Sequence, residues 1–294
     1  MTATIVAQQA INGIVLGSLY VLVALGLTLI YGVLVQINFA HADFVTLGAF
    51  SAYFFMHGTG GGYIPSIAVA LVVGAALGWL MNAAIFAPLQ KSGSELLPLI
   101  ATIGVSVMLE NAMLAWFGPI PYAFESPLSN DVIRFGGVFI TLQNVLIIAV
   151  SIATIALLYA FLKLTFLGKA LRAVSQDRET AGLMGIDPDR LVMLTFVIAS
   201  ALAGLAGAML GPVLVLTPFA GTSVIVKAFA IVIIGGFGNV EGTILAGLLV
   251  GLIESFTTQY LEPGMIDIVV FGLLLATLAI RPTGLIAEKR EENV

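Results

Sequence analysis

Long, continuously apolar stretches run through the whole sequence, and they limit the chain to a fold that sits in a membrane. Of the 294 residues, 60% are hydrophobic and only 9% are charged, whereas about 25% of residues are charged in an ordinary soluble domain. A soluble domain of this size could not cover so much apolar surface. The chain is therefore predicted to be an all-α polytopic integral membrane protein, which excludes a soluble enzyme or a nucleic-acid-binding domain. A transmembrane β-barrel is disfavoured, because its strands would be short and alternating.

The sequence offers little that could hold a metal or form a disulfide. It has 0 Cys and 2 His, which excludes a disulfide framework and a thiolate metal site and argues against a histidine-rich metal or haem site. We expect no metal site and no cofactor on this chain. The first Lys or Arg is Lys91. A signal peptide needs a basic N-terminal region, so the first apolar stretch is expected to remain as a helix.

Apolar segments with the length of membrane spans recur along the chain. Segments 40–56 and 223–236 are short for a full crossing, so either can be broken or re-entrant. We expect about 8–9 transmembrane segments in a single permease domain that covers residues 1–294, although seven crossings would give the same orientation. The predicted segments are 8–35, 40–56, 64–87, 96–117, 138–163, 190–214, 223–236, 242–260 and 265–280.

The positions of Lys and Arg predict the orientation, because cytoplasmic loops are enriched in both. With nine crossings the N-terminus lies outside and the C-terminus is cytoplasmic. Residues 118–137 then form an extracytoplasmic loop, and only Arg134 and Lys227 remain on the outer side. The basic residues assigned to the cytoplasm are Lys91, Lys163, Lys169, Arg172, Arg178, Arg190, Arg281, Lys289 and Arg290.

Glycines recur at four-residue spacing on several predicted helices. Gly13 and Gly17 show this spacing, as do Gly207 and Gly211, which favours close helix packing within the chain over a dimer interface. The pairs Gly74/Gly78 and Gly247/Gly251 each follow a short segment. Pairing of the first four spans with the last four would make an inverted-topology repeat. The alternative is chance similarity between apolar helices rich in Gly and Ala.

The charged connection 168–187 is expected to be ordered. Gly185 suits the position after a helix, and Asp187 followed by Pro188 suits the start of the next one. Composition alone fits a solvated connector, but apolar residues among the charges favour one or two amphipathic surface helices on which a partner docks. These apolar residues are Leu171, Val174, Leu183 and Met184.

Residues 179–185 read ETAGLMG, and this stretch is similar to the EAA-x-x-x-G loop in permease subunits of ABC importers. Five further stretches resemble the LivH-type subunit of branched-chain amino acid importers, with Ala42 and Thr180 as departures that alter no charge. They are the flanks of the loop (RAVSQDR and GIDPDR), residues 38–50 (NFAHADFVTLGAF), residues 227–239 (KAFAIVIIGGFGN) and residues 281–285 (RPTGL).

This resemblance implies a transmembrane permease subunit in the bacterial inner membrane. It would belong to an ATP-driven importer that translocates Leu, Ile or Val delivered by a periplasmic amino-acid-binding protein. A second related permease (LivM-type) and two cytoplasmic ATPase subunits (LivG/LivF-type) would be the partners, with membrane lipid around them and no nucleic acid.

The resemblance also implies where the ATPases dock, namely on segment 168–187. The sequence contains no G-x-x-x-x-G-K-[ST] phosphate-binding loop, so ATP and Mg²⁺ are expected on the partner ATPase subunits, and the chain is not expected to be an enzyme. The ATPase-coupling residues would be Gly168, Arg172, Ala173, Gln176, Asp177, Glu179, Ala181 and Gly185.

Polar residues inside the apolar segments are candidates for a pathway or gate, because ionisable groups in a bilayer are costly and face the interior. Buried braces between helices are the alternative, and His41 and Asp43 could instead cap segment 40–56. A glycine-rich turn at 235–238 is a gate candidate or an ordinary tight turn. The pathway or gate candidates are Asn38, His41, Asp43, Glu110, Gly235, Gly236 and Glu254.

Two other functions remain open on the residues alone. A proton- or ion-coupled secondary transporter could use Asp43, Glu110 and Glu254 as coupling carboxylates. An ABC permease for a sugar or nucleoside would show the same composition, because the transported solute is not encoded in a readable motif. An intramembrane enzyme has no supporting catalytic motif.

Overall fold

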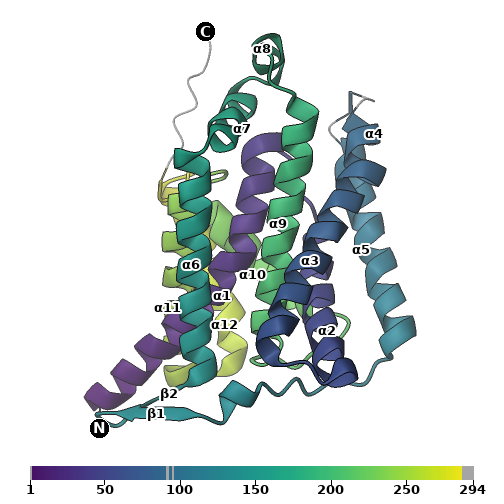
Figure 1. Cartoon of the computed structure of the whole chain (residues 1–294). Helices are drawn as coiled ribbons and strands as arrows, with labels where there is room; N and C mark the ends of the chain where they lie inside the picture. The colour runs from purple at the N-terminus through teal and green to yellow at the C-terminus, as the bar shows by residue number, and fades with distance from the viewer. Residues whose placement is uncertain (1, 91–92, 95, 287–294) are drawn as a thin grey trace.

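The structure is a computed structural model that describes residues 2–90, 93–94 and 96–286 (Figure 1). The predicted cytoplasmic residues Lys91, Lys289 and Arg290 lie outside the described residues. The α-helices are α1 (Thr2–Leu34), α2 (His41–Thr59), α3 (Tyr63–Met81), α4 (Ala87–Gln90), α5 (Leu96–Phe117), α6 (Leu142–Leu164), α7 (Phe166–Gln176), α8 (Arg178–Leu183), α9 (Pro188–Leu210), α10 (Ala220–Gly235), α11 (Val240–Tyr260) and α12 (Ile266–Ile280). A π-helical turn, Asn82–Phe86, joins α3 to α4, short 3-10 turns lie at Pro127–Ser129 and Pro263–Met265, and the strands are β1 (Val132–Phe135) and β2 (Val138–Thr141).

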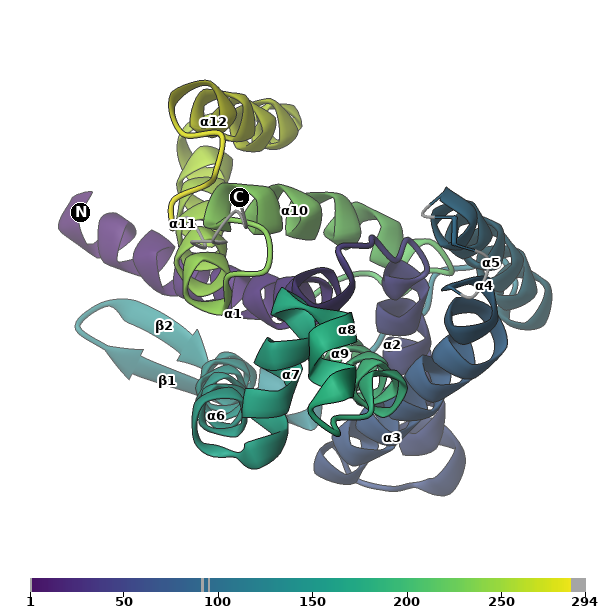
Figure 2. The same cartoon turned by 90° about the horizontal axis from the view of Figure 1, so that it is seen from above.

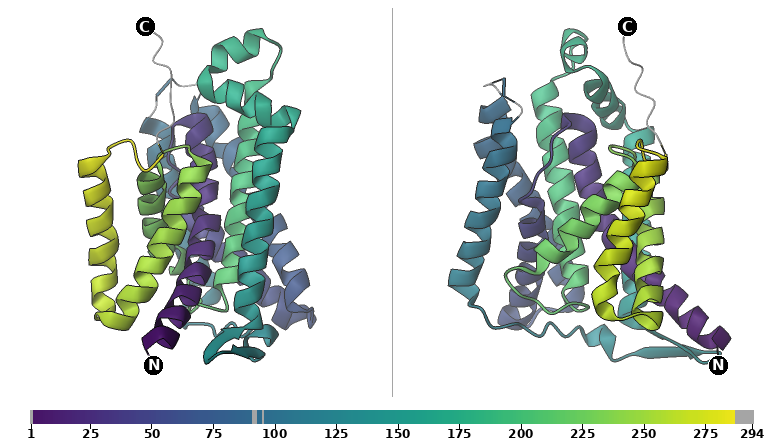
Figure 3. Two further views of the ribbon diagram at one scale, coloured as in Figure 1. Left: turned by 90° about the vertical axis from the view of Figure 1, so that its left-hand side faces the viewer. Right: turned by 180° about the vertical axis from the view of Figure 1, so that it is seen from behind.

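The helices make this a multi-pass membrane protein. Within the described ranges, six helical stretches are long and apolar enough to cross a membrane: α1, α3 with its extension to Gln90, α5, α6, α9 and α11. Helices α10 and α12 are apolar but shorter. Helices α7 and α8 and the last described residues lie at one end of the bundle, and the N-terminus and the β-hairpin lie at the other (Figures 1 and 3). We call these the α7–α8 end and the hairpin end.

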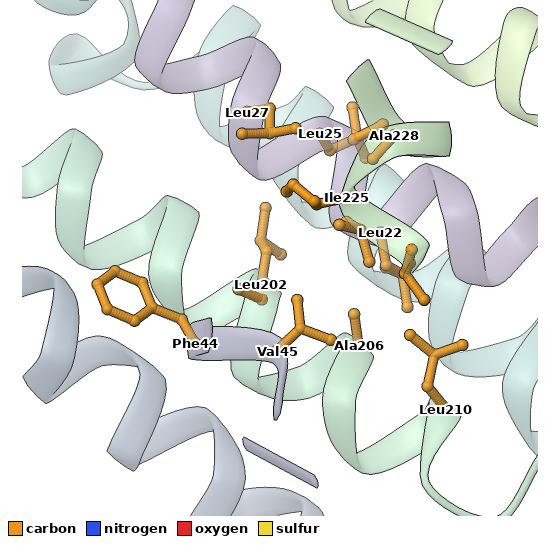
Figure 4. Packing of buried hydrophobic residues seen from close by; sticks show 14 of the residues in the cluster. Leu22, Leu25, Leu27, Phe44, Val45, Leu202, Ala206, Leu210, Ile225 and Ala228 are labelled. Carbon is orange, nitrogen blue, oxygen red and sulfur yellow. The ribbon is translucent and has the colours of Figure 1, made fainter. Parts of the chain in front are cut away.

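Helices α1 and α9 form the buried centre of the bundle. Helix α1 packs against α6, α9, α10 and α11, and α9 packs against α2 and α3. Apolar side chains fill the space between α1, α2, α9 and α10 (Figure 4). Those labelled there and buried in the core include Leu22, Leu25, Phe44, Val45, Ala206, Leu210 and Ala228.

Glycines set the two most extensive helix contacts, α1 with α11 and α3 with α9. A Cβ atom added to Gly17 would lie 2.8 Å from the Cα of Leu248 on α11. A Cβ added to Gly78 would lie 2.6 Å from the hydroxyl of Ser200 on α9. Small residues let helix backbones approach closely in a membrane. The predicted use of Gly17 in packing within the chain is therefore confirmed, and Gly78 makes a contact of the same kind.

The two short segments differ from ordinary spans because each helix begins part-way along the bundle. After α1 ends, the chain turns back and runs without helical structure to His41, where α2 starts inside the bundle (Figures 1 and 3). Between α9 and α10, residues 211–219 likewise return from the hairpin end before Ala220. Seen along the bundle, α10 extends from α11 towards α5 (Figure 2).

The prediction that a helix begins at residue 138 is wrong, because residues 138–141 form strand β2. The strand pairs antiparallel with β1, in the register Phe135 with Val138. Gly136 and Gly137 form the turn with positive φ angles of 57° and 84°, the conformation that two-residue hairpins favour. The hydroxyl oxygen of Thr141 accepts a hydrogen bond from the Asn144 N–H, and this cap starts α6 four residues later than predicted.

Replacing Gly251 by Ala is expected to destabilise the protein. The new Cβ would lie 2.6 Å from the Gly13 carbonyl oxygen, and overpacking of this kind costs about 1–3 kcal/mol. Thermal unfolding of the purified protein in detergent measures the effect. Gly272→Ala on α12 is the control, since a Cβ there meets nothing within 4 Å. Equal melting temperatures for the two variants would contradict the packing argument.

Candidate functional site

The charged connection folds as two short helices, as the sequence predicts. Thr165 starts α7 by accepting a hydrogen bond from the Gly168 N–H at 3.0 Å. Asp177 starts α8, because its Oδ1 accepts from the N–H groups of Glu179 and Thr180 at 2.9 and 3.0 Å. Gly185 then adopts a φ of 83°, and the Asp187 side chain caps α9 with Pro188 in its first turn. Both predicted helix boundaries are confirmed.

Asp177 is held in its charged form by the turn that it starts. Hydrogen bonds from the hydroxyl and the backbone N–H of Thr180, followed by the N–H of Glu179, lower the pKa of the Asp177 carboxyl below its usual value. A lowered pKa stabilises the folded turn above the ordinary pKa of an aspartate, and this contribution is lost as the pH falls. The α7–α8 junction is therefore fixed at neutral pH.

The candidate coupling residues divide into an inner and an outer set. Gly168 and Ala181 are buried, and Gly168 lies directly against the backbone of α6. Ala173 is half-buried. The exposed candidates are Arg172, Gln176, Asp177, Glu179 and Gly185.

The four apolar residues of this segment divide in the same way into a buried pair and an exposed pair. Leu171 and Val174 are buried in a small core with Ala170, Ala181 and Leu191. Leu183 and Met184 are 84% and 79% exposed at the tip. Only the second pair is free to contact another protein.

A cavity of about 360 Å³ lies beneath α7, between α1, α6, α9 and the start of α11. Its wall is mostly apolar and includes Leu158 and Leu162. Lys163 lines it and pairs with Glu241 at 3.5 Å, and Arg172 also contributes.

The segment that returns into the bundle carries three of the predicted pathway residues. Asn38, His41 and Asp43 are at most 1% exposed. The Asn38 Oδ1 accepts from the Ala40 N–H at 3.1 Å, and the His41 Nε2 lies 3.3 Å from the Val23 carbonyl oxygen on α1. Neither His41 nor Asp43 caps α2, which has no side-chain cap, so that part of the prediction is wrong.

Asp43 faces α5, where the next candidate lies. Its carboxylate is within hydrogen-bonding reach of Ser106 and within electrostatic range of Glu110. Glu110 is half-buried, and its Oε1 accepts from the Thr222 hydroxyl at 2.8 Å. Asp43 and Glu110 thus both lie near the first turn of α10, where Thr222 bonds to Glu110 and Gly221 lies against the Ala42 carbonyl oxygen.

Glu254 lies elsewhere, in a buried ion pair. Its Oε1 is 2.6 Å from the Lys227 Nζ, and its Oε2 accepts from the Tyr20 hydroxyl at 2.8 Å. Lys227 is only 17% exposed in the middle of α10. The assignment of Lys227 to the outer surface is therefore wrong, because its charge is neutralised inside the bundle rather than by water.

The glycine-rich turn joins α10 to α11 at the α7–α8 end. Gly236 has a φ of 104°, and Asn239 caps α11 by accepting from the Gly242 N–H at 2.8 Å. The Leu285 N–H donates to the Ile234 carbonyl oxygen at 2.7 Å. Gly235 and Gly236 thus have the geometry of a tight turn held by the C-terminal segment, and the break in this span lies before Ala220.

Comparison with known proteins gives the family. Residues 9–278 match the family described as branched-chain amino acid transport system / permease component. The chain belongs to this family. It is 33% identical over 301 residues to the high-affinity branched-chain amino acid transport system permease protein LivH of Escherichia coli (strain K12), covering 98% of this chain and 97% of the relative.

Two further relatives have similar descriptions. The BraD permease protein of Pseudomonas aeruginosa is 34% identical over 300 residues, with 98% of this chain and 97% of the relative covered. The LivM permease protein of Salmonella typhimurium is 25% identical over 318 residues, covering 98% of this chain and 72% of the relative. No solved structure shows significant similarity to this chain.

Sequence reasoning missed several residues that complete these sites in the permease. Lys227, Tyr20 and Thr222 all form side-chain bonds to candidate carboxylates. A signal existed only for Lys227, because a lone basic residue in an apolar segment marks an intramembrane site. Among the described residues there is no group of three His, Cys, Asp or Glu that could hold a metal ion.

Loss of one partner of the Lys227–Glu254 pair is expected to destabilise the permease. Lys227→Met leaves a buried carboxylate without a cation, and breaking a buried pair costs about 3–5 kcal/mol. The double variant Lys227→Met/Glu254→Gln removes both charges and should recover most of the loss. Thermal unfolding of the four proteins forms a double-mutant cycle. A single variant as stable as the unmodified protein would show that the pair is not a brace.

Proposed function

We propose that this chain is the transmembrane permease subunit of an ATP-driven importer for branched-chain amino acids, placed in the bacterial inner membrane. The observation that carries the proposal is the match over 98% of the chain to permeases named for high-affinity branched-chain amino acid transport. A periplasmic binding protein delivers Leu, Ile or Val. ATP and Mg²⁺ are bound by partner ATPase subunits, consistent with a sequence that has no phosphate-binding loop.

The α7–α8 end is the cytoplasmic end in this proposal. Lys163, Lys169 and Arg172 are concentrated there, and the described chain ends on the same side. Arg134 lies on the β-hairpin at the opposite end. This distribution agrees with the excess of basic residues in cytoplasmic loops. The chain crosses the membrane nine times in this orientation if the two broken spans, 35–59 and 211–235, are each counted as one crossing.

An inverted repeat accounts for the helix pairing. If α1, α2 and α3 correspond to α9, α10 and α11, a two-fold operation exchanges the α1–α11 contact with the α9–α3 contact. These are the two most extensive helix contacts. Both broken spans then occupy equivalent places in the two halves. Transporters built in this way commonly place their sites at such discontinuous helices.

Helix α8 is the proposed contact with an ATPase. It projects beyond the bundle at the α7–α8 end (Figures 1 and 3), and its exposed apolar tip, Leu183 and Met184, lies next to the exposed Glu179. Leu171 and Val174 anchor α7 to the bundle. A movement of α8 would therefore be transmitted through α7 to α6 and α9. Coupling of ATP hydrolysis to transport requires a connection of this kind.

The second permease, related to LivM, is proposed to pack on the side of α5 and α10. Glu110 is only half-buried there, and a carboxylate that faced lipid would cost about 2.5–3.5 kcal/mol. A protein surface on this side removes that cost. It also places the broken spans at the boundary between the two permeases.

Glu179→Arg is expected to uncouple ATP hydrolysis from uptake. Reversing the charge at the docking surface should reduce leucine uptake by at least about tenfold while membrane insertion stays normal. The assay is ATP-dependent uptake and ATPase activity of the reconstituted complex. Glu262→Arg, which changes the same residue type at the hairpin end, is the control and should transport normally. Full transport by Glu179→Arg would overturn the docking assignment.

Uptake is expected to require ATP and to survive collapse of the proton gradient. Proteoliposomes loaded with ATP are treated with a protonophore, and uptake of labelled leucine is recorded with the binding protein present. The rate should stay within about twofold, because ATP hydrolysis supplies the driving force. Uptake that follows the proton gradient without ATP would replace this proposal by a proton-coupled transporter.

A further inference from the structure

The first turns of α2 and α10 meet inside the bundle. The Gly221 N–H donates to the Thr46 hydroxyl oxygen at 2.9 Å, and Gly221 lies directly against the Ala42 carbonyl oxygen. Both broken spans therefore begin at one point, between the two ends of the bundle. Helix α5 runs beside this point, since the Thr222 hydroxyl donates to Glu110 at 2.8 Å.

Asp43 brings a buried carboxylate with unused bonding capacity to this point. Its side chain is 1% exposed, and its Oδ2 has no hydrogen-bond partner in the described part of the chain. Ser106 and Glu110 on α5 are the groups that it faces. A buried acceptor without a partner costs about 1–3 kcal/mol, and more when it is charged.

On the described parts of the helices around this point, no basic side chain pairs with the two carboxyl groups. On the described parts of α1, α2, α5 and α10, the basic residues are His41, His57 and Lys227. His41 lies against the Val23 carbonyl oxygen, His57 bonds to the Tyr53 carbonyl oxygen at 3.0 Å, and Lys227 is paired with Glu254. None of these basic side chains is therefore left to pair with Asp43 or Glu110.

The chemistry of the site suits an ammonium group better than a metal ion. The described residues contain no cluster of three metal-ligating side chains, so a divalent cation would lack ligands. An ammonium group has three N–H donors and no acceptor. Two carboxylates and the hydroxyl oxygens of Ser106 and Thr222 offer a matching set of acceptors from three helices.

We propose that Asp43 and Glu110 bind the α-ammonium group of the transported amino acid where the two broken spans meet. The proposal rests on the importer function proposed above and adds a substrate-binding site within the membrane, which we call the ammonium site. The ammonium group donates a hydrogen bond to the Asp43 Oδ2, which has no partner in the described part of the chain. Its positive charge compensates the negative charge of the carboxylates. A branched side chain needs only the apolar surroundings that Phe219, just before α10, and Val226 on α10 provide near Thr222.

The main test compares neutral variants with a neighbouring control. Asp43→Asn and Glu110→Gln keep the side-chain shapes and remove the charges. Each should lower leucine uptake by the reconstituted complex at least about tenfold, while ATPase activity stimulated by the binding protein continues. Asn111→Ala is the control, because its exposed amide bonds only to the Val107 carbonyl oxygen of the same helix. Its uptake should stay within about twofold.

A second measurement does not depend on transport. The chain has 0 Cys, so Thr222→Cys places one thiol beside Glu110. A cationic methanethiosulfonate reagent should modify it at least about tenfold faster than an anionic one, because carboxylates concentrate cations. Intact mass spectrometry of this chain records the rate. The preference should fall when Asp43→Asn is added.

The outcomes separate the two proposals. If the unmodified complex shows no ATP-dependent leucine uptake, both the importer function and the ammonium site are overturned. If the complex transports leucine and both acid variants transport it within about twofold of the unmodified rate, only the ammonium site is overturned. Equal reactivity of Thr222→Cys with both reagents also overturns it, even where Asp43→Asn fails to assemble. Proton-driven uptake that is lost in both variants would make the carboxylates proton carriers instead.

Discussion

Direct contact between helix backbones at glycine is the interaction on which the rest of this structure depends. Lipid gives helices no hydrophobic reason to associate, so close packing must supply the attraction. Gly17 and Gly251 bring α1 against α11, and Gly78 and Gly204 bring α3 against α9. These contacts fix α1 and α9 as the central helices. The broken spans α2 and α10 are short and can begin inside the bundle because rigid pairs surround them.

The bundle treats its buried charges in two different ways. Lys227 and Glu254 neutralise each other at 2.6 Å, and the Tyr20 hydroxyl takes up the second carboxylate oxygen. Asp43 is buried and Glu110 is half-buried, and neither has such a cation among the described residues. A protein that needed only stability would gain by replacing Asp43, because a buried carboxyl group without a partner is costly. Glu254 has the contacts of a brace, whereas the Asp43–Glu110 pair has those of a site that receives a cation from outside the chain.

The sequence predicted the features that depend on neighbouring residues, namely the apolar spans and several helix ends. It did not predict the contacts between residues that are far apart in the chain. The apolar runs predicted a helical membrane protein, and Gly185 with Asp187 marked helix boundaries that the structure reproduces. The hairpin was missed because its apolar second strand, β2, was interpreted as the start of a span, although Gly136 and Gly137 are a turn signal. The pairing of Lys227 with Glu254 could not be predicted, since the two residues lie on different helices and nothing in one sequence shows which residues meet.

The buried polar atoms without hydrogen-bond partners are concentrated in residues 36–43, the segment that returns into the bundle after α1. Four of the seven such side-chain atoms in the described part of the chain belong to the return segment: Gln36 Oε1, Asn38 Nδ2, His41 Nδ1 and Asp43 Oδ2. Native interiors contain few atoms of this kind, and each one costs about 1–3 kcal/mol. Their concentration in residues 36–43 leaves this segment with more unpartnered buried polar atoms than any other part of the described chain. Such a segment loses few hydrogen bonds when it moves, and a transport pathway that opens and closes needs a segment of this kind.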